Sequence, residues 1–522
     1  MKKWLNEIKS NPVFYTIVLG ALVFSMFNNT FFLDGSNIHR EFSAHDEYLT
    51  VREVYAILNP LSWKHFIMAV ISGSMLYYGR IMYNIDAVVA WIPFLIWGIK
   101  GMVYSIRMVH VIFALAGLIL LAKTFIKNKI GQILFLSISL LFYFTLYFFT
   151  VPKPEPTQLF FLAWFLFLFK KSEYKYGIHF ILLGISYGIK FNVLTLLPFL
   201  FILPIWHHGI DIKSALKSVA WFVIGIFVAI PCLILSPIKP KFFETYIADT
   251  FGSAKHYDDV ASVGFTDWFH PIWTEYYNGG IGFALLFILL LVLVLFHSKE
   301  FIKKSLANND TLVPIFIGLF LILPVFVTTK RLWPHYLWTG QLFLLLGVCA
   351  WNPARKRFYF FQTATLAFLL LGVFMADYKF TKGLFSRESE KRDEKKWALN
   401  SIDYIYAKMG KATILSDVSV YYPFAEFLKT RRFHPFAGPY PVELPLKAMY
   451  WRSPVSLNHI AEIDADYLLL KTEDLRTNLS ETESTLHDVE NIAAQKELRT
   501  ELGKSILFDT SIGPFKIYKI RK

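Results

Sequence analysis

A chain of 522 residues with 55% hydrophobic and 18% aromatic residues, gathered into long apolar blocks, is unlike an ordinary soluble protein. Its formal net charge of +14 does not indicate nucleic-acid binding, because most of the cations lie in short loops between apolar blocks. Its two cysteines, Cys232 and Cys349, both lie in apolar runs, so no disulfide framework is predicted.

The apolar blocks, taken in chain order, predict a polytopic membrane protein. Uncharged runs such as "FYTIVLGALVFSMF" approach the length of about 20 residues that crosses a bilayer. The stretch 66–98 is apolar but contains Arg80 and Asp86, so we expect interfacial or re-entrant helices there, with a spanning pair and thirteen crossings as the alternative. The eleven crossings that we predict are 13–33, 103–122, 130–150, 157–169, 177–190, 191–206, 218–237, 279–297, 312–329, 335–351 and 358–376.

The connections between these helices alternate in character. Six short connections carry two or three lysines or arginines each, and the positive-inside rule assigns them to the cytoplasm. The outer side then receives the amino-terminal loop 34–102, the loop 238–278 and the tail 377–522. The first apolar run lacks a cleavage site for a signal peptide, and we expect a multi-pass protein of a bacterial inner (plasma) membrane with a cytoplasmic amino terminus. The cations of the six connections are Lys2, Lys3 and Lys9; Lys123, Lys127 and Lys129; Lys170, Lys171 and Lys175; Lys213 and Lys217; Lys299, Lys303 and Lys304; and Arg355, Lys356 and Arg357.

The tail predicts a separate domain. After residue 376 the sequence turns polar, and "KATILSD", "ADYLLLK" and "PFKIYKI" are each typical of a strand, with helical stretches near 388–409 and 420–430. The predicted architecture is therefore an all-α polytopic membrane bundle over 1–376, followed by a periplasmic or extracellular α/β domain over 377–522.

Ionisable residues gather on the predicted outer face. Charges at the edge of the hydrocarbon are costly, which favours a functional role with paired partners. Each also has an ordinary interpretation: a solvated loop, a turn acid between prolines, a lysine that snorkels, or cations flanking a helix. These residues are His45, Asp46 and Glu47 after the first crossing, Lys153 and Glu155 before the fourth, Lys190 where two short apolar segments meet, and Lys330, Arg331, His335 and Tyr336 before the tenth.

One chemistry fits acids and cations on one membrane face. Transfer of a sugar from a lipid-linked phosphate needs cations that hold the phosphate as it leaves, and a carboxylate that takes the proton from the incoming hydroxyl. An isoprenoid tail also needs an apolar groove between helices, which phenylalanine-rich helices can line.

Five motifs resemble the type C (GT-C) integral-membrane glycosyltransferases, in particular the branch of the protein O-mannosyltransferases and the aminoarabinose transferases of lipid A. The likeness covers about residues 13–350, and it rests on the order of short motifs. They are "HDEYL" after the first crossing, "SIRMVHVIFALAGLILL" with its leading arginine, "KPEPTQLFFLAWFLF", "LLGISYGIKFNVLTLLPFL" and "KRLWPHYLWTGQLFLLL".

The resemblance implies roles for individual residues. Asp46 matches the first-loop catalytic acid, the general base of an inverting transfer, and Glu155 matches the second acidic position, which would orient the acceptor or assist the base. The opening "HDE" lacks the proline of the related "H-P-D-E" motif, so Glu47 also stays open as the base, with Asp46 preferred. Lys190 and Arg331 match residues that hold the donor phosphate. His335 and Tyr336 are their neighbours in the motif.

The implied partners are a polyprenyl-phosphate sugar donor, a glycan, lipid or protein acceptor with a free hydroxyl, and membrane lipids, with no nucleic acid. No cofactor is predicted firmly. Asp46, Glu155 and Asp258 carry the oxygen ligands that a divalent cation prefers, but their spacing is not diagnostic, so both readings stay open.

Two other function classes compete with the enzyme. A transporter or flippase of lipid-linked saccharides should show repeated halves and charges at mid-bilayer, and this sequence shows no clear repeat. A polymerase or ligase of surface polysaccharide also uses lipid-linked donors. The paired carboxylates favour the transferase.

Overall fold

The computed structural model divides the chain into two compact units. One comprises 1–31, 57–253 and 263–381, and the other comprises 32–56, 254–262 and 382–522. The residues whose structure is described are 10–31, 44–60, 62–72, 79–149, 151–238, 310–328, 337–351, 359–371 without 368, a few of 240–247 and 397–408, and the strands of the tail with Gly513.

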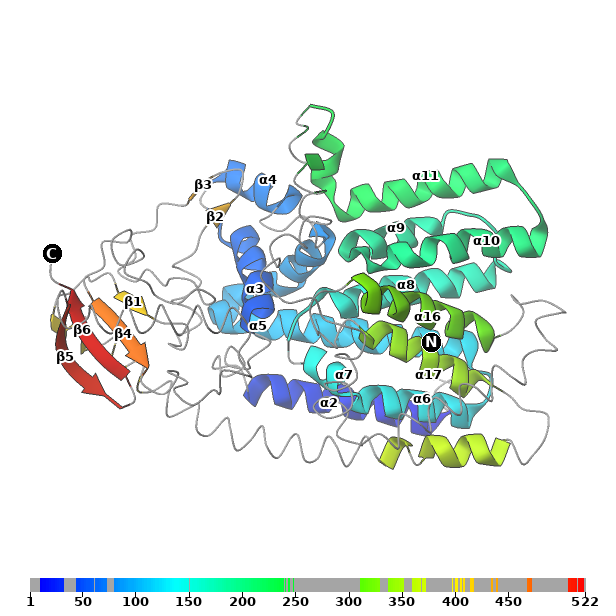
Figure 1. The fold of residues 1–522 in the computed structure, drawn as a ribbon, viewed down its shortest axis with the longest axis horizontal. Helices are drawn as coiled ribbons and strands as arrows, with labels where there is room; N and C mark the ends of the chain where they lie inside the picture. Colours follow the sequence, from blue (N-terminus) through cyan, green and yellow to red (C-terminus); the bar gives the residue numbers. More distant parts are fainter. Residues whose placement is uncertain are drawn as a thin grey trace. The chain divides into compact units, whose positions relative to one another are not determined.

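The first unit is a bundle of apolar helices that run side by side, roughly along the horizontal in Figure 1. A helix α3 (Ala44–Leu58) crosses the boundary between the two units. The described elements of the bundle are α2 (Pro12–Phe31), α4 (Trp63–Ile71), α5 (Arg80–Phe125), α6 (Lys129–Leu141), α7 (Tyr143–Phe148), α8 (Pro154–Lys171), α9 (Phe180–Ile189), η2 (Phe191–Leu196), α10 (Leu197–His208), α11 (Ile212–Ala229), η3 (Pro231–Leu235), α16 (Leu312–Thr328) and α17 (Trp338–Ala350), followed by helical residues within 359–371.

Local sequence signals fix several helix ends. The side chain of Asn128 accepts from the amide of Gly131 at the start of α6, and Asp211 accepts from the amide of Ser214 (3.1 Å) at the start of α11. Helix α8 begins with Pro154, has Glu155 in its first turn and carries two lysines in its last turn, which complements the helix dipole at both ends.

The chain is an integral membrane protein with several apolar helices of membrane-spanning length. Three described helical segments are long and apolar enough to cross a bilayer: Arg80–Phe125, Phe191–His208 and Ile212–Ala229. Ten of the predicted crossings coincide with described helical segments, and the crossing 279–297 lies outside the described residues. Helix α4 has nine residues, or about 14 Å, and is by itself too short to span a bilayer.

Helix α5 folds back on itself at Gly98. This glycine has φ 61° and ψ −143°, a combination that other residues rarely adopt, and it joins a first arm (80–97) to a second arm (99–125). His110 Nε2 lies 3.1 Å from Asp86 Oδ2 across 24 residues, which a straight helix would separate by about 36 Å. The sequence alone did not predict this hairpin.

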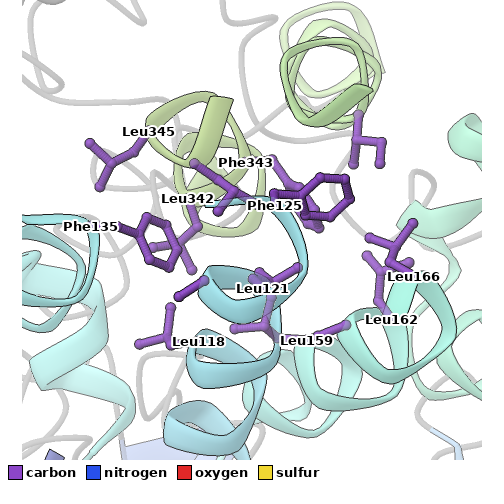
Figure 2. Packing of buried hydrophobic residues seen from close by; sticks show 14 of the residues in the cluster. Leu118, Leu121, Phe125, Phe135, Leu159, Leu162, Leu166, Leu342, Phe343 and Leu345 are labelled. Carbon is purple, nitrogen blue, oxygen red and sulfur yellow. The ribbon is translucent and has the colours of Figure 1, made fainter. Parts of the chain in front are cut away.

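The core of the bundle lies between α5, α6, α8 and α17, as Figure 2 shows. Apolar side chains from segments far apart in sequence meet there and are almost fully buried, which supplies the packing free energy of the unit. The labelled members are Leu118, Leu121 and Phe125 of α5, Phe135 of α6, Leu159, Leu162 and Leu166 of α8, and Leu342, Phe343 and Leu345 of α17.

Lysines at the ends of α5 and α8 gather at one end of the bundle, here named the Lys170 end, where they contact α2 and Asp310. Lys170 Nζ donates to the carbonyl of Thr124 (2.6 Å) and pairs with Asp310, which also pairs with Lys127 (2.9 Å). Lys123 lies 5.2 Å from the ring centroids of Phe14 and Tyr15 of α2.

The turn between α10 and α11 joins the same end. His208 Nε2 donates to the carbonyl of Glu173 (2.7 Å), next to the end of α8. The described lysines of three predicted cytoplasmic connections therefore share one end of the bundle, as the alternation of charge predicted.

The described part of the tail contains a four-stranded sheet with the order β1-β4-β6-β5. Strands β1 and β4 are parallel, whereas β4–β6 and β6–β5 are antiparallel. β1, β4 and β6 lie in the stretches predicted as strands, and β5 was missed. The predicted helix near 388–409 contains described helical residues from 397 onward, and 420–430 lies outside the described residues. The strands are β1 (Ile414–Ser416), β4 (Tyr467–Lys471), β5 (Ile506–Ile512) and β6 (Phe515–Ile520), beside a small pair, β2 (Phe433–His434) and β3 (Gly438–Pro439).

Candidate functional site

A buried ion pair joins the start of α8 to the end of α9. Lys190 Nζ lies 2.5 Å from Glu155 Oε1, and the two side chains are only 7% and 3% exposed. Glu155 is in the first turn of α8 between two prolines, and Lys190 is the extended residue (φ −154°, ψ 127°) that ends α9. Both residues are predicted site residues, and the structure brings them into direct contact.

Gln158 fixes the backbone around Lys190. It lies one turn after Glu155 on α8, and its amide nitrogen donates to the carbonyl of Lys190 (2.6 Å) and to Asn192 Oδ1 (2.7 Å). The same nitrogen lies 3.1 Å from the carbonyl of Ser186, whose hydroxyl donates back to the carbonyl of Gln158 (3.2 Å). Because α9 stops here and a 3₁₀ turn begins, these bonds supply partners for backbone groups that a continuous helix would have satisfied.

The first arm of α5 begins against the same place. The amide of Gly79 donates to the carbonyl of Ile189 (3.3 Å), and a side chain at Gly79 would collide with the backbone of Gly188. This close approach sets the next residue, Arg80, near the end of α9. Arg80 is 2% exposed, and its guanidinium lies 5.1 Å from the centroid of the Tyr83 ring.

The second arm of α5 brings further ionisable groups to the level of the Glu155–Lys190 pair along the bundle. Phe113 stacks on Phe160 of α8 with ring centroids 5.0 Å apart, and the two helices run in the same direction. Measured along the helix axes from this contact, Arg107 lies about 9 Å toward the start of its arm, and Glu155 lies about 8 Å toward the start of α8. The two residues therefore lie at a similar level along the bundle. Arg107 is buried, as is the Asp86–His110 pair one turn further along.

The end of the bundle where α8 begins and α9 ends, here named the Glu155 end, carries four buried cations and two buried carboxylates among the described residues of the first unit. Buried charges in a membrane protein are costly, so such a group favours a functional role. The cations are Arg80, Arg107, Lys153 and Lys190, and the carboxylates are Asp86 and Glu155.

Other predicted site residues have no described side chains. Asp46 and Glu47 lie in the first turn of α3, but nothing is described of their side chains. Arg331, His335, Tyr336 and Asp258 lie outside the described residues; Trp338, the first residue of α17, donates its indole N–H to Thr145 of α7 (2.8 Å). Within the described part of the chain, no three His, Cys, Asp or Glu residues form a metal-binding group, so the predicted metal candidates stay untested.

Several residues of the Glu155 end were not predicted from the sequence. His110 looks like a core residue in an apolar helix, and Gln158 looks like ordinary helix sequence. Two signals were present: the ionisable Asp86 inside an apolar stretch, and the spacing of three residues between Glu155 and Gln158, which places both on one face of α8.

Comparison with solved structures identifies a similar fold. A crystal structure of ArnT from Cupriavidus metallidurans bound to undecaprenyl phosphate matches 96% of this chain and 98% of its own chain, with a TM-score of 0.51 at 10% identity. No family model matches the chain, and no curated protein matches it in sequence. The structure thus confirms the resemblance to the lipid A aminoarabinose transferase branch of the GT-C enzymes at the level of the fold.

Proposed function

We propose that this protein is an inverting glycosyltransferase that moves a sugar from a polyprenyl-phosphate donor to a hydroxyl of a glycan, lipid or protein at the outer face of the membrane. The observation that carries the proposal is the buried Glu155–Lys190 pair at a cation-rich end of an ArnT-like bundle. The matched ArnT structure holds undecaprenyl phosphate, which supports a polyprenyl-phosphate donor for this chain.

The proposed roles follow from the chemistry of the groups. The acceptor oxygen attacks the anomeric carbon, the bond from that carbon to the phosphate oxygen breaks, and polyprenyl phosphate leaves. Lys190, with Arg331, holds the phosphate and offsets the charge that develops on it. Asp46 accepts the proton of the acceptor hydroxyl, with Glu47 as the alternative, and Glu155 orients that hydroxyl. His335 and Tyr336 flank the phosphate.

The topology completes the proposal. Assigning the lysines of the Lys170 end to the cytoplasm puts the Glu155 end at the outer face, where a polyprenyl-linked donor would present its sugar. In this proposal the tail is an extramembrane domain on the same outer side. A cysteine introduced at Ser480 and labelled in whole cells by an impermeant reagent tests this side; protection from the reagent would contradict it.

The decisive experiment measures transfer by the full-length protein in lipid nanodiscs. A labelled polyprenyl-phosphate sugar is mixed with a cell-envelope extract as the source of acceptor, and release of polyprenyl phosphate is followed. We expect Asp46→Asn to lower the rate about 100- to 10,000-fold, the range that a general base contributes. Asp211→Asn, which changes an exposed helix-capping carboxylate at the Lys170 end, should leave the rate unchanged.

Two results would contradict the proposal. A wild-type protein that releases no polyprenyl phosphate but moves labelled donor between leaflets would be a flippase. Near-normal transfer by Asp46→Asn and also by Glu47→Gln would remove both carboxylates from the role of base.

A further inference from the structure

The Glu155–Lys190 pair joins two groups that the proposed function uses for different substrates. Lys190 is proposed for the donor phosphate, and Glu155 is proposed for the acceptor hydroxyl. Lys190 Nζ and Glu155 Oε1 lie 2.5 Å apart, so each group is the ion-pair partner of the other. The two groups cannot keep this contact in full while each serves its own substrate.

The backbone on both sides of the pair is fixed, so an exchange of partners would involve the side chains. Gln158 holds the carbonyl of Lys190, and the first turn of α8 holds Glu155 between Pro154 and Pro156, whose rings fix the backbone angle φ. The ammonium group of Lys190 sits on a flexible four-carbon chain and can change partners without any movement of the helices.

The surrounding charge favours such an exchange when a phosphate arrives. Arg80 is buried beside the end of α9, and Lys153 is buried two residues before Glu155, so the anion would enter next to two further buried cations. The donor phosphate is a diester with one negative charge and becomes a monoester with more charge and more acceptor oxygens when the sugar leaves. It therefore competes for the buried ammonium group while it is bound, and most strongly at the moment of departure.

We propose that the phosphate of the polyprenyl lipid takes Lys190 from Glu155, and that this exchange frees the Glu155 carboxylate for the acceptor hydroxyl. The donor then binds before the acceptor, because without the donor the acceptor-orienting carboxylate is held by Lys190. This inference rests on the proposed function and adds an order of binding and an internal competitor for the phosphate site.

Because Glu155 competes with the phosphate for Lys190, the exchange can be tested with the lipid product of the transfer alone. The probe is undecaprenyl phosphate, titrated into the full-length protein in detergent and followed by native mass spectrometry, with undecaprenol and inorganic phosphate as separate ligands. Removing the competitor in Glu155→Gln should tighten binding of undecaprenyl phosphate about tenfold, the factor that corresponds to about 1.4 kcal/mol, and should leave undecaprenol unchanged. In the transfer assay the same variant should be slower, so donor affinity and rate change in opposite directions.

Two further variants guard against a trivial result. Glu155→Asp keeps the charge but shortens the reach toward Lys190, and it should also tighten binding if Glu155→Gln does not fold. Glu173→Gln removes an exposed pair with Lys175 at the Lys170 end and should leave binding unchanged.

The outcomes separate the exchange from the proposed function. Unchanged or weaker binding of undecaprenyl phosphate in both Glu155 variants would overturn the exchange, because a pair that only supports the fold has no reason to oppose the ligand. Equal tightening for inorganic phosphate would overturn the lipid as the source of the phosphate. A wild-type protein that binds undecaprenol as well as undecaprenyl phosphate would overturn the proposed donor itself.

Discussion

The two ends of the bundle both carry pairs of lysine and carboxylate groups, but in opposite surroundings. At the Lys170 end, Asp310 (14% exposed) lies between a Lys170 side chain that is 26% exposed and a Lys127 side chain that is 85% exposed. At the Glu155 end, the side chains of Lys190 and Glu155 are 7% and 3% exposed. The chemical groups are the same, and the difference lies in the water around them.

That difference separates an ordinary role from a functional one. Ion pairs in contact with water contribute from about zero to 1 kcal/mol and weaken in salt. A buried pair must offset the cost of removing two charges from water, so it adds little net stability, yet breaking it is costly. The lysines of the Lys170 end fit the proposed cytoplasmic side, whereas the buried pair fits the proposed site of transfer.

The largest effect that this comparison predicts is on Lys190. Lys190→Met fills the same volume but leaves the buried Glu155 carboxylate without its ammonium partner. We expect the free energy of unfolding to fall by about 3–5 kcal/mol, the usual cost of breaking a buried pair from one side. Thermal unfolding of the purified protein in detergent would measure the loss.

The matched control removes both charges. Lys190→Met combined with Glu155→Gln leaves no unpaired charge at this position, so a large part of the lost stability should return. Sugar transfer should stay absent, because the donor phosphate still lacks Lys190. A double variant no more stable than Lys190→Met alone would show that the charge on Glu155 is not what the single variant destabilises.

A histidine at the Lys170 end shows a third case, a titratable group that is buried in its neutral form. Among the described residues it has no charged partner that would offset burial of the charged form. His179, in the turn between α8 and α9, packs against the rings of Phe165, Phe169 and Phe180. Burial lowers the pKa of His179 to about 4, from an ordinary value of 6.5. Between these values the unfolded chain takes up a proton that the folded protein refuses. Stability should therefore be complete above pH 6.5 and decline as the pH falls toward 4.

The expected loss at the acid end is up to about 3 kcal/mol, at about 1.4 kcal/mol for each unit of pKa shift. Melting temperatures of the wild type and of His179→Phe, measured at pH 7.5 and 4.5, would test it, because the variant lacks this titration and should lose less stability in acid. Equal losses in both proteins would show that His179 does not titrate as its burial implies.

The helices could be predicted from the sequence because long uncharged runs leave few alternatives. The hairpin in α5 could not. The run on either side of Gly98 is equally apolar, and nothing local announces that Asp86 and His110 will meet across 24 residues. Strand β5 was missed for a different reason: "ILFDTSI" mixes polar and apolar residues, and its pairing with β6 around Gly513 decides its conformation.

The site was predictable as a set of residues and not as a set of contacts. Glu155 and Lys190 stood out because each interrupts or ends an apolar segment. Their direct pairing depends on the antiparallel packing of α8 and α9 and on the break in α9 that Gln158 holds. No single motif encodes that combination.

The smallest predicted effect is at Asp310, the carboxylate shared by Lys127 and Lys170. Asp310→Asn keeps the shape of the side chain but removes its charge, and because both lysine partners keep contact with water (85% and 26% exposed) the unfolding free energy should fall by about 1 kcal/mol. The loss should shrink further in 1 M salt, since exposed charges are screened, whereas the loss from Lys190→Met should persist because its partner is buried. Thermal unfolding of both variants at low and high salt compares the two ends directly. An Asp310→Asn loss that equals the Lys190→Met loss and resists salt would mean that exposure does not separate the two ends.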